Sequence, residues 1–373
     1  MFLRSLVSIS VPSTSNAGVK WTYDHELDHV TTNKPLIIAH RGFSGAVPEH
    51  TVEAYEMAVE YGADVIECDA ALTKDLVVVC LHECWMNEST DVASKFAPDR
   101  SSQYFIPGSN ITIRDYFSID FTLEELKTLG KVEKRTFRNQ DYNGKFKIST
   151  LEEMIGVAKS SKRPIGLHVE LKDATFFNTN VPMLEKAKKK FEDIVIEILH
   201  KEGYSSKRSP CFVQSFYEDS LMYVSSISPL PLVYLMDYPA DTSQERLKSI
   251  SKYAYGIGPD KRHFVQVDDA NKTITGRSSD LIKRCRDSNL RIHTYTFRNE
   301  FMFLPWDYHQ DPCNEMMDFF LLGIDGYFTD FPETAFNFFS LIYHSQKSAA
   351  CSFDFNLVRL IILFSLIVFN YFF

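Results

Sequence analysis

Residues 36–83 read LIIAHRGFSGAVPEHTVEAYEMAVEYGADVIECDAALTKDLVVVCLHE, and this stretch decides the fold. Its first four residues are apolar and predict a short buried strand that ends at His40 and Arg41. A loop follows, and then an amphipathic pattern that predicts a helix beginning after Thr51. A second apolar strand is expected over 65–69. The stretch therefore predicts a strand, a helix and a strand in succession, with polar side chains at the strand ends.

The second strand carries two carboxylates. Glu67 and Asp69 are two residues apart, so their side chains project from the same face of the strand. Like charges this close repel each other unless a cation lies between them. We therefore expect a site for a hard divalent metal ion.

The next apolar run, 77–82, begins too soon after Asp69 to be a parallel neighbour, because a parallel crossover needs about a dozen residues or more. We expect it to fold back as an antiparallel hairpin. If residues 73–76 form the turn, the numbers of paired residues sum to 149, and His82 lies opposite Glu67. This register would place a second histidine beside the carboxylates.

The order of these motifs resembles that of the glycerophosphodiester phosphodiesterase family over about residues 35–340. The matching motifs are His40-Arg41-Gly42, Pro48-Glu49-His50-Thr51, the run from Gly62 through Asp69, Thr73-Lys74-Asp75 and His82-Glu83. Glu83 stands where the family usually has Asp, which leaves the role of this residue open.

The remaining chain alternates predicted strands with predicted helices. Further strands are expected at 165–171, 211–216, 232–236, 255–258, 291–297 and 326–329, and helices at 150–160, 183–202, 217–226, 243–253, 278–289 and 332–344. With the strands at 36–40 and 65–69 this gives eight parallel strands. Eight such units predict an α/β fold, a TIM (β/α)₈ barrel, whose active site lies at the C-terminal ends of the strands.

Residues 83–150 interrupt this alternation and are expected to form an insertion after the second strand. One helix start is clear there, at Thr122 with Glu125 three residues later. The segment resembles the capping insertion of the bacterial periplasmic and plant types of the family.

A third carboxylate completes the expected metal site. Glu170 and Lys172 alternate onto one face of a strand and match the family's E-x-K motif. Three carboxylates without cysteine or paired histidine ligands favour Ca²⁺ or Mg²⁺ over zinc. Resemblance to the bacterial secreted type favours Ca²⁺.

The resemblance also assigns roles to the side chains at the strand ends. It makes His40 and His82 the catalytic acid and base, without deciding which is which. Arg41 and Lys172 would neutralise the phosphate anion, whose charge otherwise repels a nucleophile.

Five further residues match the family's motifs or lie beside them. For Gln214 and Tyr295, substrate contact and packing both stay open. We expect structural roles for His293 and Arg298. Glu49 is expected to orient Arg41 rather than to bind the metal.

The expected function is metal-dependent hydrolysis of glycerophosphodiesters, such as glycerophosphocholine and glycerophosphoethanolamine, to sn-glycerol 3-phosphate and an alcohol. One alternative is a lysophospholipase D, which deep apolar lining from aromatic residues of 83–150 would favour. These aromatic residues are Phe96, Tyr104, Phe105, Tyr116 and Phe117. The other alternative is an inactive, membrane-tethered binding protein, against which the intact set of expected catalytic residues argues.

Composition limits the partners and the redox chemistry. The formal net charge is −9, and no basic patch interleaves with aromatics, so nucleic acid is excluded as a partner. The seven cysteines show neither a CxxC pair nor zinc-ligand spacing, and we expect them to be buried free thiols. Oligomeric state does not follow from the sequence.

The chain is expected to divide into an N-terminal segment 1–34, the barrel 35–345 and a hydrophobic tail 346–373. Residues 1–34 contain a short apolar run that is below the standard of a signal peptide. The apolar end 360–373 is short for a spanning helix and suits either the removed tail of a GPI signal or a tail anchor. A membrane-associated protein outside the cell, or in the lumen of the secretory pathway, is the expectation.

Overall fold

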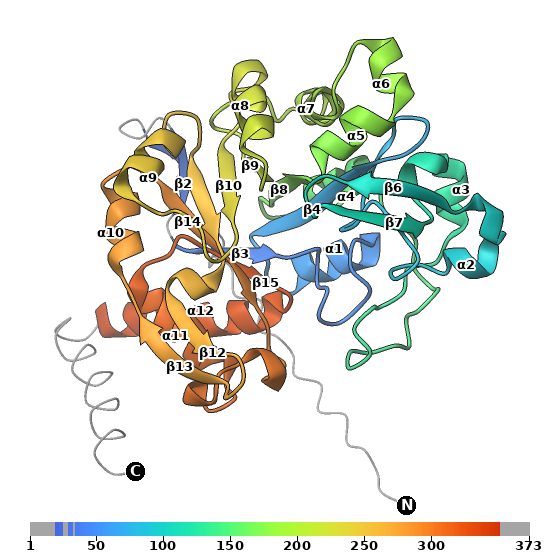
Figure 1. The fold of residues 1–373 in the computed structure, drawn as a ribbon. Helices are drawn as coiled ribbons and strands as arrows, with labels where there is room; N and C mark the ends of the chain where they lie inside the picture. Colours follow the sequence, from blue (N-terminus) through green and yellow to red (C-terminus); the bar gives the residue numbers. More distant parts are fainter. Residues whose placement is uncertain (1–18, 25–28, 33, 351–373) are drawn as a thin grey trace, which may run out of the picture.

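A barrel of eight parallel strands forms the centre of the computed structural model, which describes residues 19–24, 29–32 and 34–350 (Figure 1). The strands are β3 (Leu36–Ala39), β4 (Val65–Leu72), β8 (Gly166–Leu171), β9 (Cys211–Ser215), β10 (Leu232–Met236), β11 (Gly256–Pro259), β14 (Arg291–Phe297) and β15 (Gly326–Thr329). Each pairs with the next, and β3 pairs with both β15 and β4, which closes the sheet. The predicted TIM barrel is confirmed.

Helices follow the strands and cover the outside of the barrel. The main ones are α1 (Val52–Glu60), α4 (Leu151–Ser160), α7 (Phe191–Lys201), α8 (Glu218–Ile227), α9 (Gln244–Ile250), α10 (Asp280–Arg286), α11 (Pro312–Leu322) and α12 (Pro332–Ala350). The single helix expected at 183–202 is wrong, because α6 (Pro182–Ala187) ends at Lys188 in a left-handed conformation with φ 54°. Helix α11 was not predicted, since its apolar run 316–322 lacks a clear helical spacing.

Successive side chains of a barrel strand point alternately into the barrel and out towards the helices, so the core has two parts. Ile38 packs in a small cluster with apolar residues of the other strands, while Ile37 and Ala39 pack in the large cluster that includes the helices. Both sides of β3 and β4 are buried throughout, as is usual for parallel strands covered by helices. This packing fixes the strand ends, and so fixes the polar side chains that follow them.

The hairpin expected after β4 is present, because β5 (Val78–Cys80) pairs antiparallel with it. Its predicted register is wrong by one residue, since Ala70 pairs with Cys80 and the paired numbers sum to 150. The turn is longer than assumed. Thr73 N–H donates to the Val77 carbonyl oxygen, and Leu76 takes a left-handed conformation with φ 62°. His82 follows the end of β5 and is therefore not paired across from Glu67.

A disulfide joins Cys68 of β4 to Cys80 of β5, with the Cα atoms 5.5 Å apart. The expectation of free thiols is therefore wrong for these two residues, which only the strand pairing brings together. Cys84, Cys211 and Cys285 are buried and free, and Cys313 is half-buried and free.

The segment 83–150 lies beside the barrel and contains its own small elements. These are α2 (Val92–Lys95), β6 (Ser102–Ile106), β7 (Ile111–Asp115) and α3 (Leu123–Thr128). The predicted helix start is confirmed, because Thr122 and Glu125 form a reciprocal capping box at α3. A second hairpin, β12 (Val265–Asp268) and β13 (Thr273–Arg277), was not predicted and follows β11 on the other side of the barrel (Figure 1).

Most of the two expected terminal segments lie outside the described residues. At the N-terminal end, β1 (Trp21–Asp24) and β2 (His29–Thr32) form a separate antiparallel pair. The predicted signal run and residues 351–373 of the hydrophobic tail are among the residues that the structure does not describe. Within the described ranges, no helix combines the length and apolar character that a membrane crossing requires.

Candidate active site

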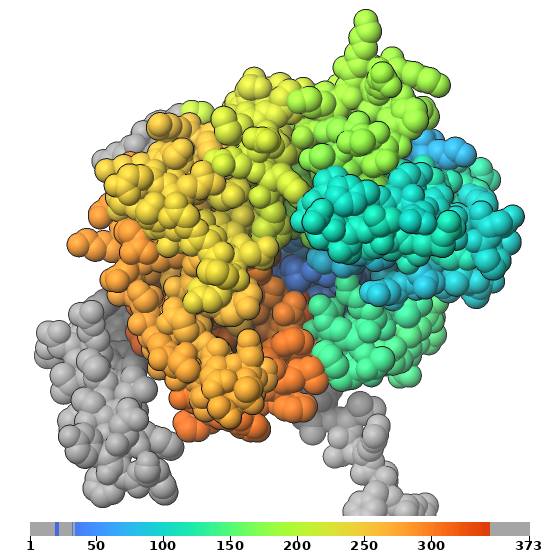
Figure 2. Space-filling view, viewed as in Figure 1, coloured from blue at the N-terminus to red at the C-terminus, as the bar shows by residue number. Residues whose placement is uncertain are grey.

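A cavity of about 410 Å³ opens among the C-terminal ends of the barrel strands. Figure 2 shows the hollow at the centre of this face, floored by the blue atoms of the first strands and flanked by teal and orange segments. Among the expected site residues, its wall contains His40, Arg41, Glu67, His82, Glu170, Lys172, Gln214 and Tyr295. Glu49 and Asp69 reach the site through hydrogen bonds and ion pairs to these residues. The barrel therefore brings together residues from separate strands that the sequence analysis had singled out.

Three buried carboxylates converge at the floor of the cavity. Glu67 and Asp69 leave β4, and Glu170 leaves the neighbouring strand β8, where its Cα pairs with that of Asp69. One oxygen of each lies within 4.8 Å of the others. Burial raises the pKa of Glu67, and repulsion from Asp69 and Glu170 raises it further. This hard oxygen donor set fits a divalent cation such as Ca²⁺ or Mg²⁺, whose charge would relieve the repulsion.

Asp69 is held by a residue to which the sequence analysis gave no role. His50 lies in the loop before α1, and its Nε2 is 2.8 Å from Asp69 Oδ2, while its Nδ1 is 2.9 Å from the Tyr55 hydroxyl. Burial alone would raise the pKa of Asp69, but Lys172, His82 and His50 hold it well below its ordinary value. His50 belongs to the quoted Pro-Glu-His-Thr motif, so the motif was the available signal.

Arg41 is the cation at the centre of the site. Its backbone N–H donates to Glu67 at 2.7 Å, its Nη1 donates to Glu49 at 2.8 Å, and its Nε lies 3.4 Å from Asp69. The expected contact between Glu49 and Arg41 is therefore present. Burial lowers the pKa of Arg41, but these carboxylates raise it above its ordinary value, so the guanidinium keeps its charge.

Local backbone geometry explains the glycine in the His-Arg-Gly motif. Arg41 and Gly42 are both left-handed, with φ 61° and 81°. A Cβ on Gly42 would lie 2.8 Å from the backbone of Ala54 in α1. Glycine therefore lets the chain turn tightly between strand and helix, which aims the histidine and arginine at the cavity.

Each candidate catalytic histidine is held by a carboxylate at its Nδ1. His40 Nδ1 lies 2.6 Å from Asp330 Oδ1, and His82 Nδ1 lies 2.5 Å from Glu83 Oε1. We assign the Nδ1–H tautomer to both rings, because a carboxylate can only accept. Their unprotonated Nε2 atoms then accept hydrogen bonds, from Arg41 Nε at 3.2 Å for His40 and from Lys172 Nζ at 3.1 Å for His82. Glu83, whose role the sequence left open, thus holds the ring of His82.

The environment keeps both rings neutral. Burial and then Arg41 lower the pKa of His40 to about 4, against the opposing effect of Asp330. Burial, Arg41 and Lys172 lower the pKa of His82 to about 3. Each ring can therefore accept a proton at Nε2 near neutral pH.

Residues 131–138, within the segment 83–150, support both carboxylates, and the sequence analysis did not predict this role. Arg138 donates to Asp330 at 2.6 Å, and Arg298 donates to the other side of the same oxygen at 2.8 Å. Lys134 lies 3.2 Å from Glu83. These contacts join residues up to 192 positions apart, so no local sequence pattern could have indicated them.

The remaining residues singled out from the sequence differ in whether they line the cavity. Gln214 donates to Glu67 at 3.4 Å, and Tyr295 donates through its hydroxyl to the Met236 carbonyl oxygen at 3.0 Å; both line the cavity. His293 lies lower in the barrel and pairs with His168 at 3.2 Å, a structural position. Arg298, for which a structural role was expected, also lines the cavity.

The cavity wall lacks the apolar lining from residues 83–150 that would favour the lysophospholipase D alternative. None of the residues that line this cavity belongs to 83–150, whereas many belong to the loops between residues 260 and 319. Tyr104 and Phe117 instead pack edge to face against each other, 4.8 Å apart, and both contact Phe176. The segment 83–150 therefore supplies supporting charges here rather than an apolar lining.

Comparisons with known proteins agree on one family. The model of the glycerophosphoryl diester phosphodiesterase family matches residues 40–334. The glycerophosphodiester phosphodiesterase GDPD6 of Arabidopsis thaliana is 40% identical over 329 residues, with 82% of this chain and 86% of that protein covered. The glycerophosphodiester phosphodiesterase of Haemophilus influenzae is 29% identical over 348 residues, covering 81% and 89%.

A solved structure shares the fold. It is an Oleispira antarctica phosphodiesterase in complex with the product sn-glycerol-3-phosphate, with a TM-score of 0.57, 20% identity, and coverage of 82% of this chain and 97% of that one.

Proposed function

The chain belongs to the glycerophosphoryl diester phosphodiesterase family, and we propose that it hydrolyses glycerophosphodiesters by metal-assisted acid–base catalysis at His40 and His82. The products are sn-glycerol 3-phosphate and an alcohol. The observation that supports this most is the convergence of both histidines, two cations and three carboxylates on one cavity.

Charge neutralisation is the first contribution of the site. Arg41 is buried and Lys172 is partly exposed, and both cations line the cavity, where they bind the anionic oxygens of the phosphate. Glu67, Asp69 and Glu170 would hold a divalent cation, Ca²⁺ by the family resemblance or Mg²⁺, which would supply Lewis-acid stabilisation on the order of several kcal/mol. Repulsion between the phosphate and the attacking oxygen is thereby reduced.

Proton transfer is the second contribution. One histidine accepts a proton at Nε2 from the attacking hydroxyl, and the other donates a proton to the departing alcohol oxygen. Asp330 and Glu83 hold the two rings in the required tautomer. The negative charge of a bound phosphate raises the pKa of a nearby imidazole, which allows one ring to hold a proton in the complex.

The substrates we propose are glycerophosphocholine, glycerophosphoethanolamine and glycerophosphoglycerol. The shared phosphate and glycerol half bind at the cations and the metal site. The glycerol 2-hydroxyl is next to the phosphorus, so it can attack first and form a cyclic phosphate that water opens. Diesters without this hydroxyl, such as bis-p-nitrophenyl phosphate, should then be poor substrates. The alternative activity, a lysophospholipase D, is less favoured because charged pairs line the cavity.

Measuring sn-glycerol 3-phosphate release from glycerophosphocholine by the purified protein tests the proposal. EDTA should abolish release, and Ca²⁺ or Mg²⁺ should restore it. His40→Ala or His82→Ala should each lower kcat by at least about 100-fold with the fold unchanged, because each removes a proton-transfer group. Full activity in EDTA or in either variant would refute the assigned roles. Binding of the diester without cleavage would instead indicate the inactive binding protein.

We also propose that the chain enters the secretory pathway and is held at a membrane through residues 346–373. The Cys68–Cys80 disulfide supports an oxidising compartment. Deleting 360–373 should yield a soluble, active protein. Release of the full-length form by phosphatidylinositol-specific phospholipase C would indicate a GPI anchor, and release by detergent alone a tail anchor. A full-length protein already found in the soluble fraction would contradict both.

A further inference from the structure

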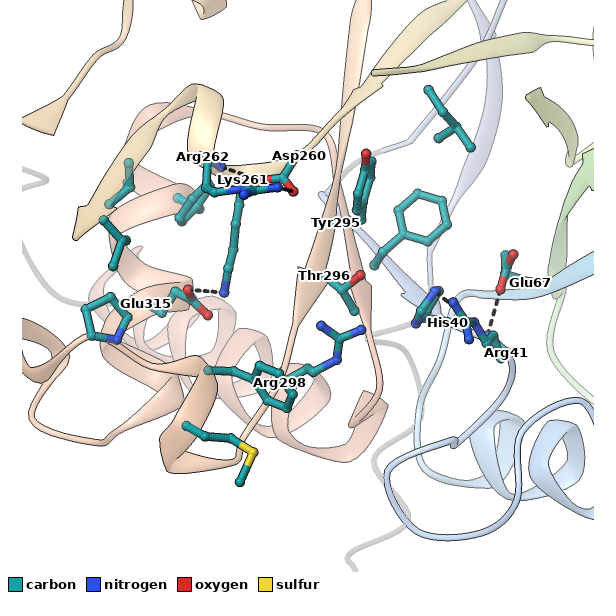
Figure 3. Close-up of a pocket in the computed structure, with 18 of the residues that line it drawn as sticks. His40, Arg41, Glu67, Asp260, Lys261, Arg262, Tyr295, Thr296, Arg298 and Glu315 are labelled. Carbon is teal, nitrogen blue, oxygen red and sulfur yellow. Dashed lines mark hydrogen bonds and ion pairs between the residues drawn. The ribbon is translucent and has the colours of Figure 1, made fainter. Parts of the chain in front are cut away.

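The cavity continues past the catalytic residues into a side compartment walled by loops that follow β11 and β14. Figure 3 shows Tyr295, Thr296 and Arg298 between His40, Arg41 and Glu67 on one side and Asp260, Lys261, Arg262 and Glu315 on the other. We define the side compartment by the lining residues Lys261, Val265, Val267, Met302, Phe303 and Glu315. The catalytic roles proposed above use none of them.

Lys261 and Glu315 form the polar centre of the side compartment. Lys261 Nζ lies 2.6 Å from Glu315 Oε1, and Glu315 is only 2% exposed. The second carboxylate oxygen, Oε2, is buried with no hydrogen-bond partner among the described residues. An unsatisfied buried acceptor costs about 1–3 kcal/mol, and a ligand hydroxyl that donates to it would remove this cost.

The other charges of this wall largely cancel. Arg262 pairs with Asp260 at 2.8 Å, and Arg298 pairs with Asp330 at 2.8 Å. Asp269 and Lys272 add one charge of each sign. No excess of one sign is therefore present to select an ammonium or an acidic group.

Between the charged pairs the wall is apolar. Val265, Val267, Met302 and Phe303 lie beside Lys261 and Glu315 in the lining. Such a combination of apolar surface with one donor and one free acceptor matches a neutral polyol, which has C–H surface and several hydroxyls.

We propose that the side compartment binds the alcohol half of diesters whose alcohol carries vicinal hydroxyls, either a glycerol or an inositol group. Lys261 donates to the oxygen of one hydroxyl, and Glu315 Oε2 accepts the proton of its neighbour. The proposal rests on the proposed function, because the phosphate must lie at Arg41 and Lys172 for the alcohol to extend past His40. Lys261 and Glu315 are then specificity-determining residues.

The test compares kcat/KM of the full-length, metal-loaded protein on four substrates. In the alcohol half, glycerophosphoglycerol and glycerophosphoinositol carry a vicinal diol, and glycerophosphoethanolamine and glycerophosphocholine do not. Lys261→Met and Glu315→Gln should each lower kcat/KM about tenfold for the diol substrates, the effect of losing about one hydrogen bond. Values for the ethanolamine and choline substrates should stay within about twofold.

Two further variants separate recognition from stability. The double variant Lys261→Met/Glu315→Leu leaves no buried charge unpaired and should show the same selective loss. Arg277→Met is the matched control, because Arg277 pairs with Asp318 of α11 at 2.9 Å without lining the cavity. It should leave all four values unchanged.

The outcomes are distinct. A selective loss for one diol substrate alone supports the proposal and identifies glycerol or inositol as the group bound. An equal loss for all four substrates, or no loss for any, would overturn it. Failure of the wild-type protein to cleave any of the four would instead refute the proposed function on which the side compartment depends.

Discussion

At the scale of single residues, the floor of the site holds carboxylates whose negative charges repel one another and need a positive partner. Glu67 is the clearest case, because it is buried beside Asp69 and Glu170, and both raise its pKa. Arg41 and Gln214 supply hydrogen bonds to it. These contacts leave a concentration of negative charge for which a bound cation is the natural complement.

Glu67→Gln should remove the metal-induced stabilisation of the protein. In the metal-free protein the substitution relieves carboxylate repulsion, so the Tm should stay equal or rise. Adding Ca²⁺ should raise the Tm of the wild-type protein, because ligand binding to the folded state stabilises it. Thermal unfolding of EDTA-treated protein, with and without Ca²⁺, measures both effects.

Asp64→Asn is a suitable control, since Asp64 is a buried carboxylate that contacts Lys34 and the Ile37 N–H outside the metal cluster. This variant should retain the Ca²⁺-induced rise in Tm. A full rise in Glu67→Gln would show that the ion binds elsewhere.

At the scale of elements, residues 131–138 connect the segment 83–150 to the barrel. Arg138 is 3% exposed at its side chain and contacts Asp330, which in turn contacts His40. It also donates to the carbonyl oxygen of Ser44 and to Glu300. Arg138 therefore acts on His40 through Asp330, as a positioning residue.

Arg138→Met should lower kcat about tenfold while changing KM little, because the ring of His40 loses part of its restraint. Removing a positive charge from behind Asp330 also favours protonation of His40. The limb of the kcat–pH profile that His40 controls, the acidic limb for a base and the basic limb for an acid, should therefore move to higher pH. Steady-state kinetics from pH 5 to 8 measure both changes.

Arg100→Met is the matched control, since Arg100 also lies in the segment 83–150 but pairs with Glu125 away from the cavity. Its profile should coincide with that of the wild-type protein. A merely structural role of Arg138 would lower the amount of folded protein without moving the pH profile.

At the scale of the whole molecule, stability should depend on pH through histidines buried in the barrel. His168 and His293 are almost fully buried, and their rings contact each other at 3.2 Å. Burial is the main cause that lowers the pKa of His293 to about 4. Asp325 acts to raise this pKa, and Arg291 lowers it further. The folded protein thus keeps this ring neutral, whereas the unfolded chain protonates it below about pH 6.5.

The free energy of unfolding should therefore fall as the pH decreases from about 6.5 towards 4, because the unfolded state binds more protons over this range. His293→Asn keeps a polar atom near the position of Nδ1 but does not titrate. Between pH 7 and pH 5 it should lose about 2 kcal/mol less than the wild-type protein. Urea unfolding at several pH values gives the two curves, and parallel curves would contradict the assignment.

The sequence by itself determined the barrel and the residues that converge on its cavity. Strand periodicity is a local property of the sequence, and in a barrel of this type the residues at the C-terminal ends of the strands face the active site. Glu67, Glu170 and His40 could therefore be placed at that end of the barrel from the pattern. The antiparallel return of β5 followed from loop length. Its register did not, because one left-handed residue in the turn, Leu76, shifts the pairing by one.

Only the tertiary structure decided which partners these residues have. The Cys68–Cys80 disulfide depends on the strand register, and the contacts of Asp330 with His40 and Arg138 join three distant segments. The Lys261–Glu315 pair likewise crosses from one loop to helix α11. Such contacts arise when the barrel closes and brings the ends of its strands together. A local sequence pattern does not indicate which distant residues then become neighbours.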